Sequence, residues 1–136
     1  MRKAVLMMLL AVVSSSAAAA WIEVGSDETT TVYADPATIR TEGNMVKMWH
    51  LLDFKAVTVP PGGKRYMYLS SKSKAEYDCK EERARVLSFS WYSGNMGEGK
   101  VVYSTSKPGQ WEPVAPESAI ELLWNIACGK IVTVRR

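Results

Sequence analysis

Few residues of this chain have side chains that could carry out chemistry. There is one histidine, His50, and there are two cysteines, Cys79 and Cys128. One histidine excludes a His–His metal site, and cysteines that pair with each other are neither nucleophiles nor metal ligands. The segment Gly62–Lys64 lacks the spacing of a phosphate-binding loop, and Arg65 stands where such a loop has Ser or Thr. The sequence therefore predicts a protein that is not an enzyme and that uses no metal ion or other cofactor.

The first 20 residues have the three parts of a secretory signal peptide. Basic Arg2 and Lys3 precede the apolar run 4–13, and the small residues 14–20 suit a signal peptidase. The apolar run is about half as long as a membrane-spanning helix needs to be. We therefore expect residues 1–20 to be a signal peptide, the protein to be exported to the periplasm or the cell surface, and no stable transmembrane segment to remain.

Residues 21–136 are expected to form a single domain closed by a disulfide bond. Their number suits one modest hydrophobic core. Export brings both cysteines into an oxidising compartment, where an even number indicates pairing. We expect Cys79 and Cys128 to be bonded to each other, and two separate free thiols are the alternative. Loss of Arg2 and Lys3 leaves 15 basic residues against 14 acidic ones, which argues against a nucleic-acid partner.

The elements that must position these residues are mostly short strands separated by turns. β-branched, aromatic or alternating residues predict strands over 29–34, 45–54, 65–77, 86–92 and 100–105. Pro36 is expected to end the first strand, with one helical turn directly after it. Because the links are short and rich in turns, the strands should pair in antiparallel fashion. The expected fold class is α+β, with an antiparallel sheet of about five to six strands and one helix packed on it.

That helix is expected near the C-terminus. Pro116 should lie in its first turn and Gly129 just after its end. Between them, four apolar residues recur at helical spacing: Ile120, Leu123, Trp124 and Ala127. Cys128 then falls in the last turn and Cys79 follows the 65–77 strand, so the disulfide would join the helix to the sheet. Residues 130–136 are expected to be either a last edge strand or a frayed tail.

The strand over 45–54 shows the clearest alternation. Its more apolar face should meet the core and consists of Val46, Met48, His50, Leu52 and Phe54. We expect His50 to be a packed core residue rather than a catalytic one. Trp49, on the other face, and the tyrosines of the 65–77 strand could instead contact a partner, since aromatic residues anchor interfaces.

The strongest candidate for a binding surface is a basic segment that contains tyrosines. Alternation along 65–77 predicts that Lys72 and Lys74 share a face with Tyr66 and Tyr68. Such a stripe suits an acidic protein partner or a sulfated glycan. The alternatives are a solvated outer face, or lysines that prevent aggregation at a strand edge. The predicted partner-binding residues are Lys64, Arg65, Tyr66, Tyr68, Lys72, Lys74, Arg83 and Arg85.

Several segments, taken in order, resemble the surface-adhesin protein E family of Gram-negative bacteria. The resemblance extends from Trp21 to about Gly129, and its most specific parts are the step Tyr77–Cys79, the loop Trp111–Pro113 and the end of the helix at Ala127–Gly129. The segments that carry it are Val32–Ile39, Met48–Phe54, Tyr66–Cys79, Asn95–Gly99 and Trp111–Gly129.

The resemblance implies a compact antiparallel sheet with a packed helix and the Cys79–Cys128 bridge. The founding member of the family is an outer-membrane lipoprotein that binds host matrix and serum proteins such as laminin and vitronectin, and it can form dimers. By this resemblance we expect adhesin-like binding of a matrix or serum protein, and a homodimer. This chain has no cysteine beside the expected cleavage site, so the alternative is a periplasmic assembly or stress-related protein that binds another bacterial protein.

Overall fold

The computed structural model describes residues 20–130. Residues 1–19 of the expected signal peptide and residues 131–136 of the expected last strand or tail lie outside the described residues. The strands are β1 (Ile22–Ser26), β2 (Thr30–Glu42), β3 (Met45–Thr58), β4 (Tyr68–Asp78), β5 (Arg83–Tyr92), β6 (Val101–Thr105) and β7 (Glu112–Pro113). The helices are the 3₁₀ turns η2 (Lys64–Tyr66) and η3 (Asn95–Gly97) and the α-helix α2 (Ala119–Ala127).

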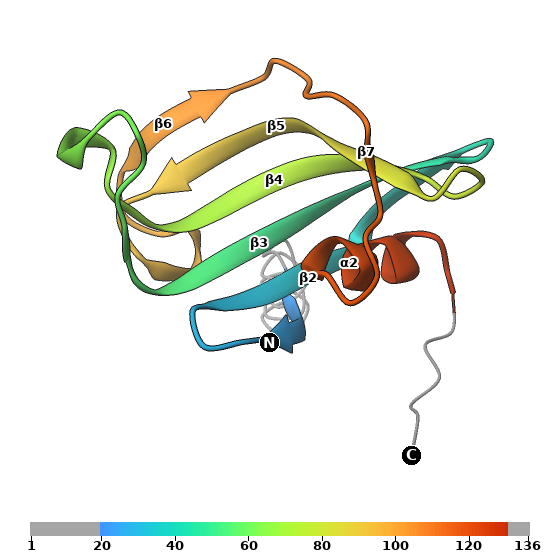
Figure 1. Cartoon of the computed structure of the whole chain (residues 1–136), viewed down its shortest axis with the longest axis horizontal. Coiled ribbons are helices and arrows are strands. Elements are labelled where there is room, and N and C mark those ends of the chain that lie inside the picture. Colours follow the sequence, from blue (N-terminus) through green and yellow to red (C-terminus); the bar gives the residue numbers. More distant parts are fainter. Residues whose placement is uncertain (1–19, 131–136) are drawn as a thin grey trace, which may run out of the picture.

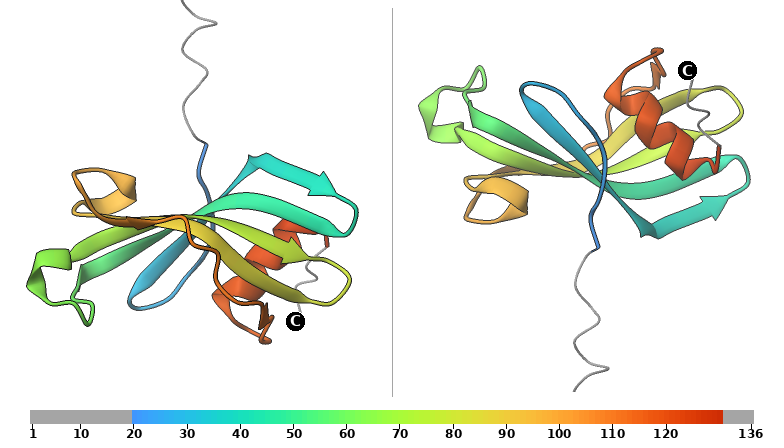
Figure 2. Two further views of the ribbon diagram at one scale, coloured as in Figure 1. Left: turned by 90° about the horizontal axis from the view of Figure 1, so that it is seen from above. Right: turned by 90° about the horizontal axis from the view of Figure 1, so that it is seen from below.

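The strands form one antiparallel sheet in which sequence neighbours pair with each other. The order is β1-β2-β3-β4-β5-β6, and the short β7 pairs with β5. In Figure 1, α2 lies across one face of this sheet, and Figure 2 shows that the sheet is strongly twisted, with α2 on one side only. The predicted fold class is confirmed, with β1 and β7 in addition to the five predicted strand ranges. Among residues 20–130, no helix has the length and apolar character that crossing a membrane requires.

The two faces of the sheet are defined by residues that oppose each other across the strands. Directly opposed residues of an antiparallel pair have their side chains on the same face. Val46, Tyr77 and Ala84 oppose one another across β3, β4 and β5 and pack beneath α2, so we call their side the helix face. Lys47 and Glu76, each next to a member of that row, oppose each other on the other side, which we call the back face.

The predicted inward face of β3 is confirmed. Met48 is 0% exposed and His50 is 5% exposed, and both lie on the helix face. The strand continues beyond the predicted end at Phe54 as far as Thr58. The back face also has a buried position, because Leu51 is 0% exposed. β3 is therefore covered on both sides near its middle.

β2 is longer than the sequence predicts, because a bulge carries the strand past Pro36. The predicted strand end at Pro36 and the helical turn after it are both wrong. The pairing register shifts between residues 35 and 40, so the missing N–H of Pro36 leaves no gap in the ladder. At the bulge, the backbone N–H of Trp49 donates to a side-chain hydroxyl, Thr38 Oγ1 (3.0 Å), in place of a backbone carbonyl of β2. Thr38 Oγ1 in turn donates to the carbonyl of Asp35 (2.6 Å).

The start of β4 also differs from the prediction. The residues expected to open this strand form η2 instead, and β4 begins at Tyr68. The backbone N–H of Tyr66 donates to the carbonyl of Gly63 (3.1 Å), and that of Met67 donates to the carbonyl of Lys64 (3.2 Å). These local bonds satisfy backbone groups that a strand would pair with a neighbour.

α2 begins later than predicted. Pro116 and Glu117 precede it, and Ser118 is the N-cap, whose hydroxyl accepts a hydrogen bond from the backbone N–H of Glu121 (3.2 Å). The predicted end is confirmed, since Gly129 has a φ of 66° just after the helix, a conformation that glycine adopts without strain.

The core lies beneath α2, at what we call the closed end of the helix face. Leu123, Trp124 and Ala127 are buried against the row that includes Tyr77, as the predicted apolar stripe requires. The indole N–H of Trp124 donates to the carbonyl of Asp78 (3.0 Å). The predicted disulfide is present between Cys79 and Cys128 and ties the end of the helix to the end of β4.

Candidate functional site

The other end of the helix face, which we call the open end, carries a set of aromatic rings that α2 does not cover. Tyr68 stacks on Trp91, with ring centroids 4.4 Å apart and planes within 7°. Phe54 meets Tyr68 edge-on at 5.5 Å, and Trp91 contacts Tyr103 at 4.9 Å. Phe89 contacts both Trp91 and Tyr103, and Tyr66 meets Tyr103 edge-on. We call this set the aromatic patch; it consists of Phe54, Tyr66, Tyr68, Phe89, Trp91 and Tyr103.

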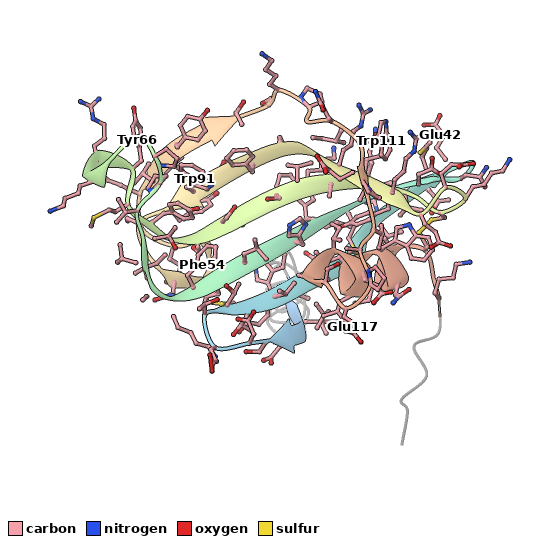
Figure 3. All side chains as sticks on the ribbon, viewed as in Figure 1. Glu42, Phe54, Tyr66, Trp91, Trp111 and Glu117 are labelled. Carbon is pink, nitrogen blue, oxygen red and sulfur yellow. A yellow bond between two sulfur atoms is a disulfide. The ribbon has the colours of Figure 1, made fainter. Side chains whose placement is uncertain are left out.

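The aromatic patch runs across four strands. Phe54 lies on β3, Tyr68 on β4, Trp91 on β5 and Tyr103 on β6. Neighbouring strands are about 4.8 Å apart, so the patch spans about 14 Å from β3 to β6. Figure 3 labels Phe54, Tyr66 and Trp91 at this end of the sheet, away from α2. The rings therefore form a continuous surface rather than isolated exposed residues.

Solvent reaches this surface. Tyr103 is 42% exposed, and the other five rings are partly exposed. The neighbouring rings withdraw Tyr68 from water, which raises the pKa of its hydroxyl above the usual range. The phenol is therefore neutral at physiological pH and can donate a hydrogen bond. Large, half-buried, pre-packed rings with polar tips are the residues that dominate protein interfaces.

A pocket of about 420 Å³ lies between the aromatic patch and the start of α2. Its apolar walls include Val32, Leu52 and Leu122, and Phe54 belongs to both the pocket and the patch. Gly25 lets the helix approach the sheet here, because a Cβ at that position would lie 2.6 Å from Leu122 Cδ1. The pocket has the size and lining of a site that receives an apolar side chain.

The rim of this pocket is acidic. Asp27, Glu117 and Glu121 all line it. The backbone N–H groups of Thr29 and Thr30 donate to Asp27 Oδ1 at 2.9 Å each and lower the pKa of this carboxyl, so it stays ionised. At the opposite end of the aromatic patch, Lys64 and Arg65 are exposed on η2 and supply positive charge. The surface thus runs from an acidic pocket across the rings to a basic turn.

The structure separates the predicted partner-binding residues into three places. Lys64, Arg65, Tyr66 and Tyr68 are at the open end of the helix face, where the Arg65 guanidinium lies 5.7 Å from the centre of the Tyr66 ring. The other four residues are on the back face, in two groups. One group is Lys72 and Lys74, and the other is Arg83 and Arg85.

The expectation that Lys72 and Lys74 share a face with Tyr66 and Tyr68 is wrong. Trp91 opposes Ser71, so the Tyr68 ring that stacks on Trp91 is on the helix face. Lys72 opposes Leu51 and its ammonium lies over the ring of Tyr92 (4.9 Å), on the back face. Tyr68 and Lys72 are four residues apart within β4, so regular alternation would place them on one face. The pairing of β3 with β4 shifts between the Asp53–Ser70 and Thr58–Tyr68 pairs, and this irregularity breaks the alternation before Ser70.

Arg83 and Arg85 are engaged within the fold. Arg83 Nε lies 3.0 Å from Asp78 Oδ2, and Arg85 Nη2 lies 2.9 Å from Glu76 Oε1. Both guanidinium groups also lie over the ring of Trp111, at 4.4 and 4.7 Å. These interactions fix the loop that links β6 to α2 against the back face, and they leave the two arginines less available to a ligand than the sequence suggests.

His50 is placed as a core residue, as predicted. It opposes Ala34 and Ser73 on the helix face, and its Nδ1 is buried without a hydrogen-bond partner among the described residues. Burial lowers the pKa of His50 to about 4. The imidazole is therefore neutral at physiological pH and has no access to a dissolved substrate.

Sequence reasoning missed four of the six rings of the patch as binding candidates: Phe54, Phe89, Trp91 and Tyr103. The alternation of these residues within each strand is visible in the sequence. What the sequence does not contain is the register that brings Trp91 opposite Tyr103, or the fact that α2 stops short of this end. The available signal was the high aromatic content of three adjacent predicted strands.

Comparison with known proteins places this fold. Among solved structures, that of Haemophilus influenzae protein E is similar, with a TM-score of 0.60 and 16% identity over 80% of this chain and 83% of that chain. Crystal form II of the same protein gives a TM-score of 0.58 and 11% identity over 83% of this chain and 97% of that one. At these identities the likeness shows the fold alone. No curated protein sequence matches the chain significantly.

The family model described as Surface-adhesin protein E matches residues 21–129, which is nearly all of the described part of the chain. The model thus includes β1 to β7, α2 and both cysteines of the disulfide. On this evidence the chain belongs to the surface-adhesin protein E family.

Proposed function

We propose that this protein is an exported, non-enzymatic adhesin that holds a protein ligand on the aromatic patch. The observation that carries the proposal is the ring surface itself, which continues the helix face beyond the start of α2 and remains open to solvent. Membership of a surface-adhesin family supports the same reading. The role of the closed end is then to keep the strands rigid, so that the rings are pre-arranged before a ligand arrives.

The charges at the two ends of the surface indicate what the ligand should look like. The pocket beside α2 is apolar inside and acidic at its rim, and η2 at the other end is basic. A matching segment has an apolar or aromatic anchor with a basic neighbour at the pocket, and an acidic residue about 14 Å further along. Host matrix or serum proteins are the class of ligand that we propose, with laminin and vitronectin as the probes.

Binding to immobilised laminin and vitronectin tests this proposal. The mature protein, residues 21–136, should bind at least one of them saturably. Tyr103→Ala removes an exposed ring and should raise the Kd at least tenfold, because central aromatic residues carry a large share of interface energy. Tyr92→Ala is the matched control, since it removes a ring of similar size from the back face and should change the Kd less than twofold.

Two results would overturn the proposal. Absence of saturable binding by the wild-type protein would remove the adhesin function. Equal affinities of the Tyr103→Ala variant and the wild type would remove the aromatic patch as the binding surface. Protease treatment of whole cells adds the location: loss of the protein from intact cells supports display at the surface, whereas release by osmotic shock supports the periplasmic alternative.

A further inference from the structure

The back face of the sheet contains a groove that the adhesin proposal does not use. Two hollows of about 240 and 300 Å³ adjoin each other, because Arg40 and Lys47 line both. Lys74 and Trp49 complete the first hollow, and Glu42 lies in the second. We call this feature the basic groove and define it by Arg40, Lys47, Trp49 and Lys74.

The cations of the basic groove are placed side by side across three strands. Arg40 on β2 opposes Lys47 on β3, and Lys47 is a diagonal neighbour of Lys74 on β4, which opposes Trp49. Like charges directly opposite each other destabilise a sheet, and diagonal neighbours are about 7–8 Å apart. This fold therefore tolerates a mutual repulsion here that a bound anion would relieve.

The acidic residues of the groove line its larger hollow, where Glu42 and Glu76 lie. Glu76, which opposes Lys47, is engaged by Arg85 at 2.9 Å. Asp35 opposes Trp49 but is 5% exposed, and Glu42 lies at the β2–β3 turn. Within residues 20–130, neither of the two ion pairs includes a cation of the groove. The smaller hollow, which Arg40, Lys47 and Lys74 line without an acidic residue, therefore carries the net positive charge of the groove.

Trp49 gives the groove a flat wall between the charges. Its indole is partly exposed, and its backbone N–H is fixed by the hydroxyl of Thr38 at the β2 bulge. The bulge removes residues 36–39 from the ladder, which opens the hollow beside Trp49. An indole face packs well against the flat apolar face of a sugar ring, whereas a small inorganic ion would gain no such apolar contact.

We propose that the basic groove binds a sulfated glycan chain, with Arg40, Lys47 and Lys74 on its sulfates and Trp49 against a sugar ring. Cations spread over three strands fit an extended polyanion better than a single ion. A membrane surface fits less well, because membrane-binding surfaces insert apolar side chains. The large apolar residues exposed among the described residues lie outside the groove: Ile22, Val57, Val59, Met67, Val101 and Tyr103. The site is independent of the aromatic patch and lies on the opposite face of the sheet.

Binding of a fluorescent heparan sulfate octasaccharide to the mature protein tests this inference. Lys47→Gln/Lys74→Gln should weaken binding at least tenfold at physiological salt. The matched control Lys64→Gln/Arg65→Gln also removes two charges, but from η2, and should weaken binding less than twofold. Raised salt should weaken wild-type binding steeply, because exposed charges are screened. Both variants should unfold at or above the wild-type temperature, which excludes a loss of folding as the cause.

Further ligands separate the glycan from other polyanions. Trp49→Leu should weaken binding of the octasaccharide more than binding of inorganic polyphosphate, which has no sugar ring. A desulfated octasaccharide should not bind. The inference is overturned if the groove variant binds as tightly as the wild type, if the η2 control loses as much affinity, or if polyphosphate, oligo(dT) or anionic lipid vesicles bind as tightly as the sulfated glycan.

Discussion

The closed and open ends of the helix face are built from the same strands but are finished differently. At the closed end, Tyr77 is 0% exposed beneath α2, and the disulfide holds the helix in place. At the open end, Tyr103 is 42% exposed and contacts the rings of Tyr66, Phe89 and Trp91. Both ends contain large aromatic residues, but α2 covers those at the closed end only.

Under the proposed function, this difference indicates how a small domain can combine stability with a binding surface. The hydrophobic effect drives burial at both ends, but the chain provides a nine-residue helix, which covers only part of the sheet. The buried core is concentrated under that helix, and the remaining rings stay partly exposed, where we propose that a partner covers them. Mutations at the closed end should therefore cost folding free energy, and mutations at the open end should cost binding.

Loss of the disulfide should have the largest effect on stability. Cys79→Ala/Cys128→Ala removes a crosslink between residues 49 apart and should lower the free energy of unfolding by about 4 kcal/mol on the chain-entropy model. Urea unfolding followed by far-UV circular dichroism measures this loss, and reduction of the wild type should reproduce it. A loss below about 1 kcal/mol would show that the closed end does not depend on the staple.

A pair of truncations compares the two ends directly. Leu123→Ala leaves a cavity beneath α2 and should cost about 3 kcal/mol, whereas Tyr103→Ala at the open end should cost less than about 1 kcal/mol. Leu123 is 2% exposed, so truncating its side chain removes buried apolar contacts that solvent does not replace. Urea midpoints of both variants provide the measurement. Equal losses would contradict the division into a stabilising end and a binding end.

Acid should lower the stability of the fold through His50. Burial lowers the pKa of this imidazole to about 4 from an unfolded value of 6.5, so the unfolded chain takes up a proton that the folded chain resists. The folded state has its full stability with respect to this group above pH 6.5, where the imidazole is neutral in both states, and it loses stability as the pH falls towards 4. Between pH 7 and pH 5 the free energy of unfolding should drop by about 2 kcal/mol from this group.

His50→Gln is the control for that measurement. The variant has a neutral side chain of similar size at the same position and should show a flatter dependence of stability on pH over this range. Carboxylates titrate in both proteins, so the difference between the two curves isolates His50. Parallel curves would mean that the imidazole accepts its proton within the folded protein.

A small effect on stability is also expected for the loop that connects the open end to the closed end. Trp111 in this loop lies over Arg83 and Arg85 on the back face. Trp111→Ala should lower the free energy of unfolding by about 1 kcal/mol, because exposed cation–π contacts are weak individually. The near-UV circular dichroism of the stacked rings should change only by the contribution of the lost indole, and a broader loss of signal would show that the loop also shapes the patch.

The sequence contained most of the information for the closed end. The stripe on α2 and the alternation of β3 follow from helical and strand periodicity, and Gly129 marks the helix end. The disulfide followed from export and an even cysteine count. These are local patterns, so they can be recognised without knowledge of the tertiary structure. The errors at Pro36 and at the start of β4 arose where a bulge and a 3₁₀ turn interrupted the regular period.

The open end and the basic groove could not be predicted in the same way. The contacts between Trp91, Tyr68 and Tyr103 depend on strand register, and Arg40 meets Lys47 only because the β2 bulge resets the pairing. The predicted basic stripe treated nearby residues in sequence as one surface. The sheet divides them between two faces and pairs two of the arginines with acids. The residues that make up each surface are therefore determined by how the strands pair and not by how close the residues are in the sequence.

Hydroxyl-radical footprinting of the protein bound to laminin or vitronectin tests the central claim most directly. The account predicts that oxidation of the exposed rings Tyr66 and Tyr103 falls several-fold in the complex, while Tyr92 and Trp111 on the back face react as in the free protein. Protection of the back-face rings with unchanged reactivity of Tyr66 and Tyr103 would contradict the assignment of the open end as the adhesive surface.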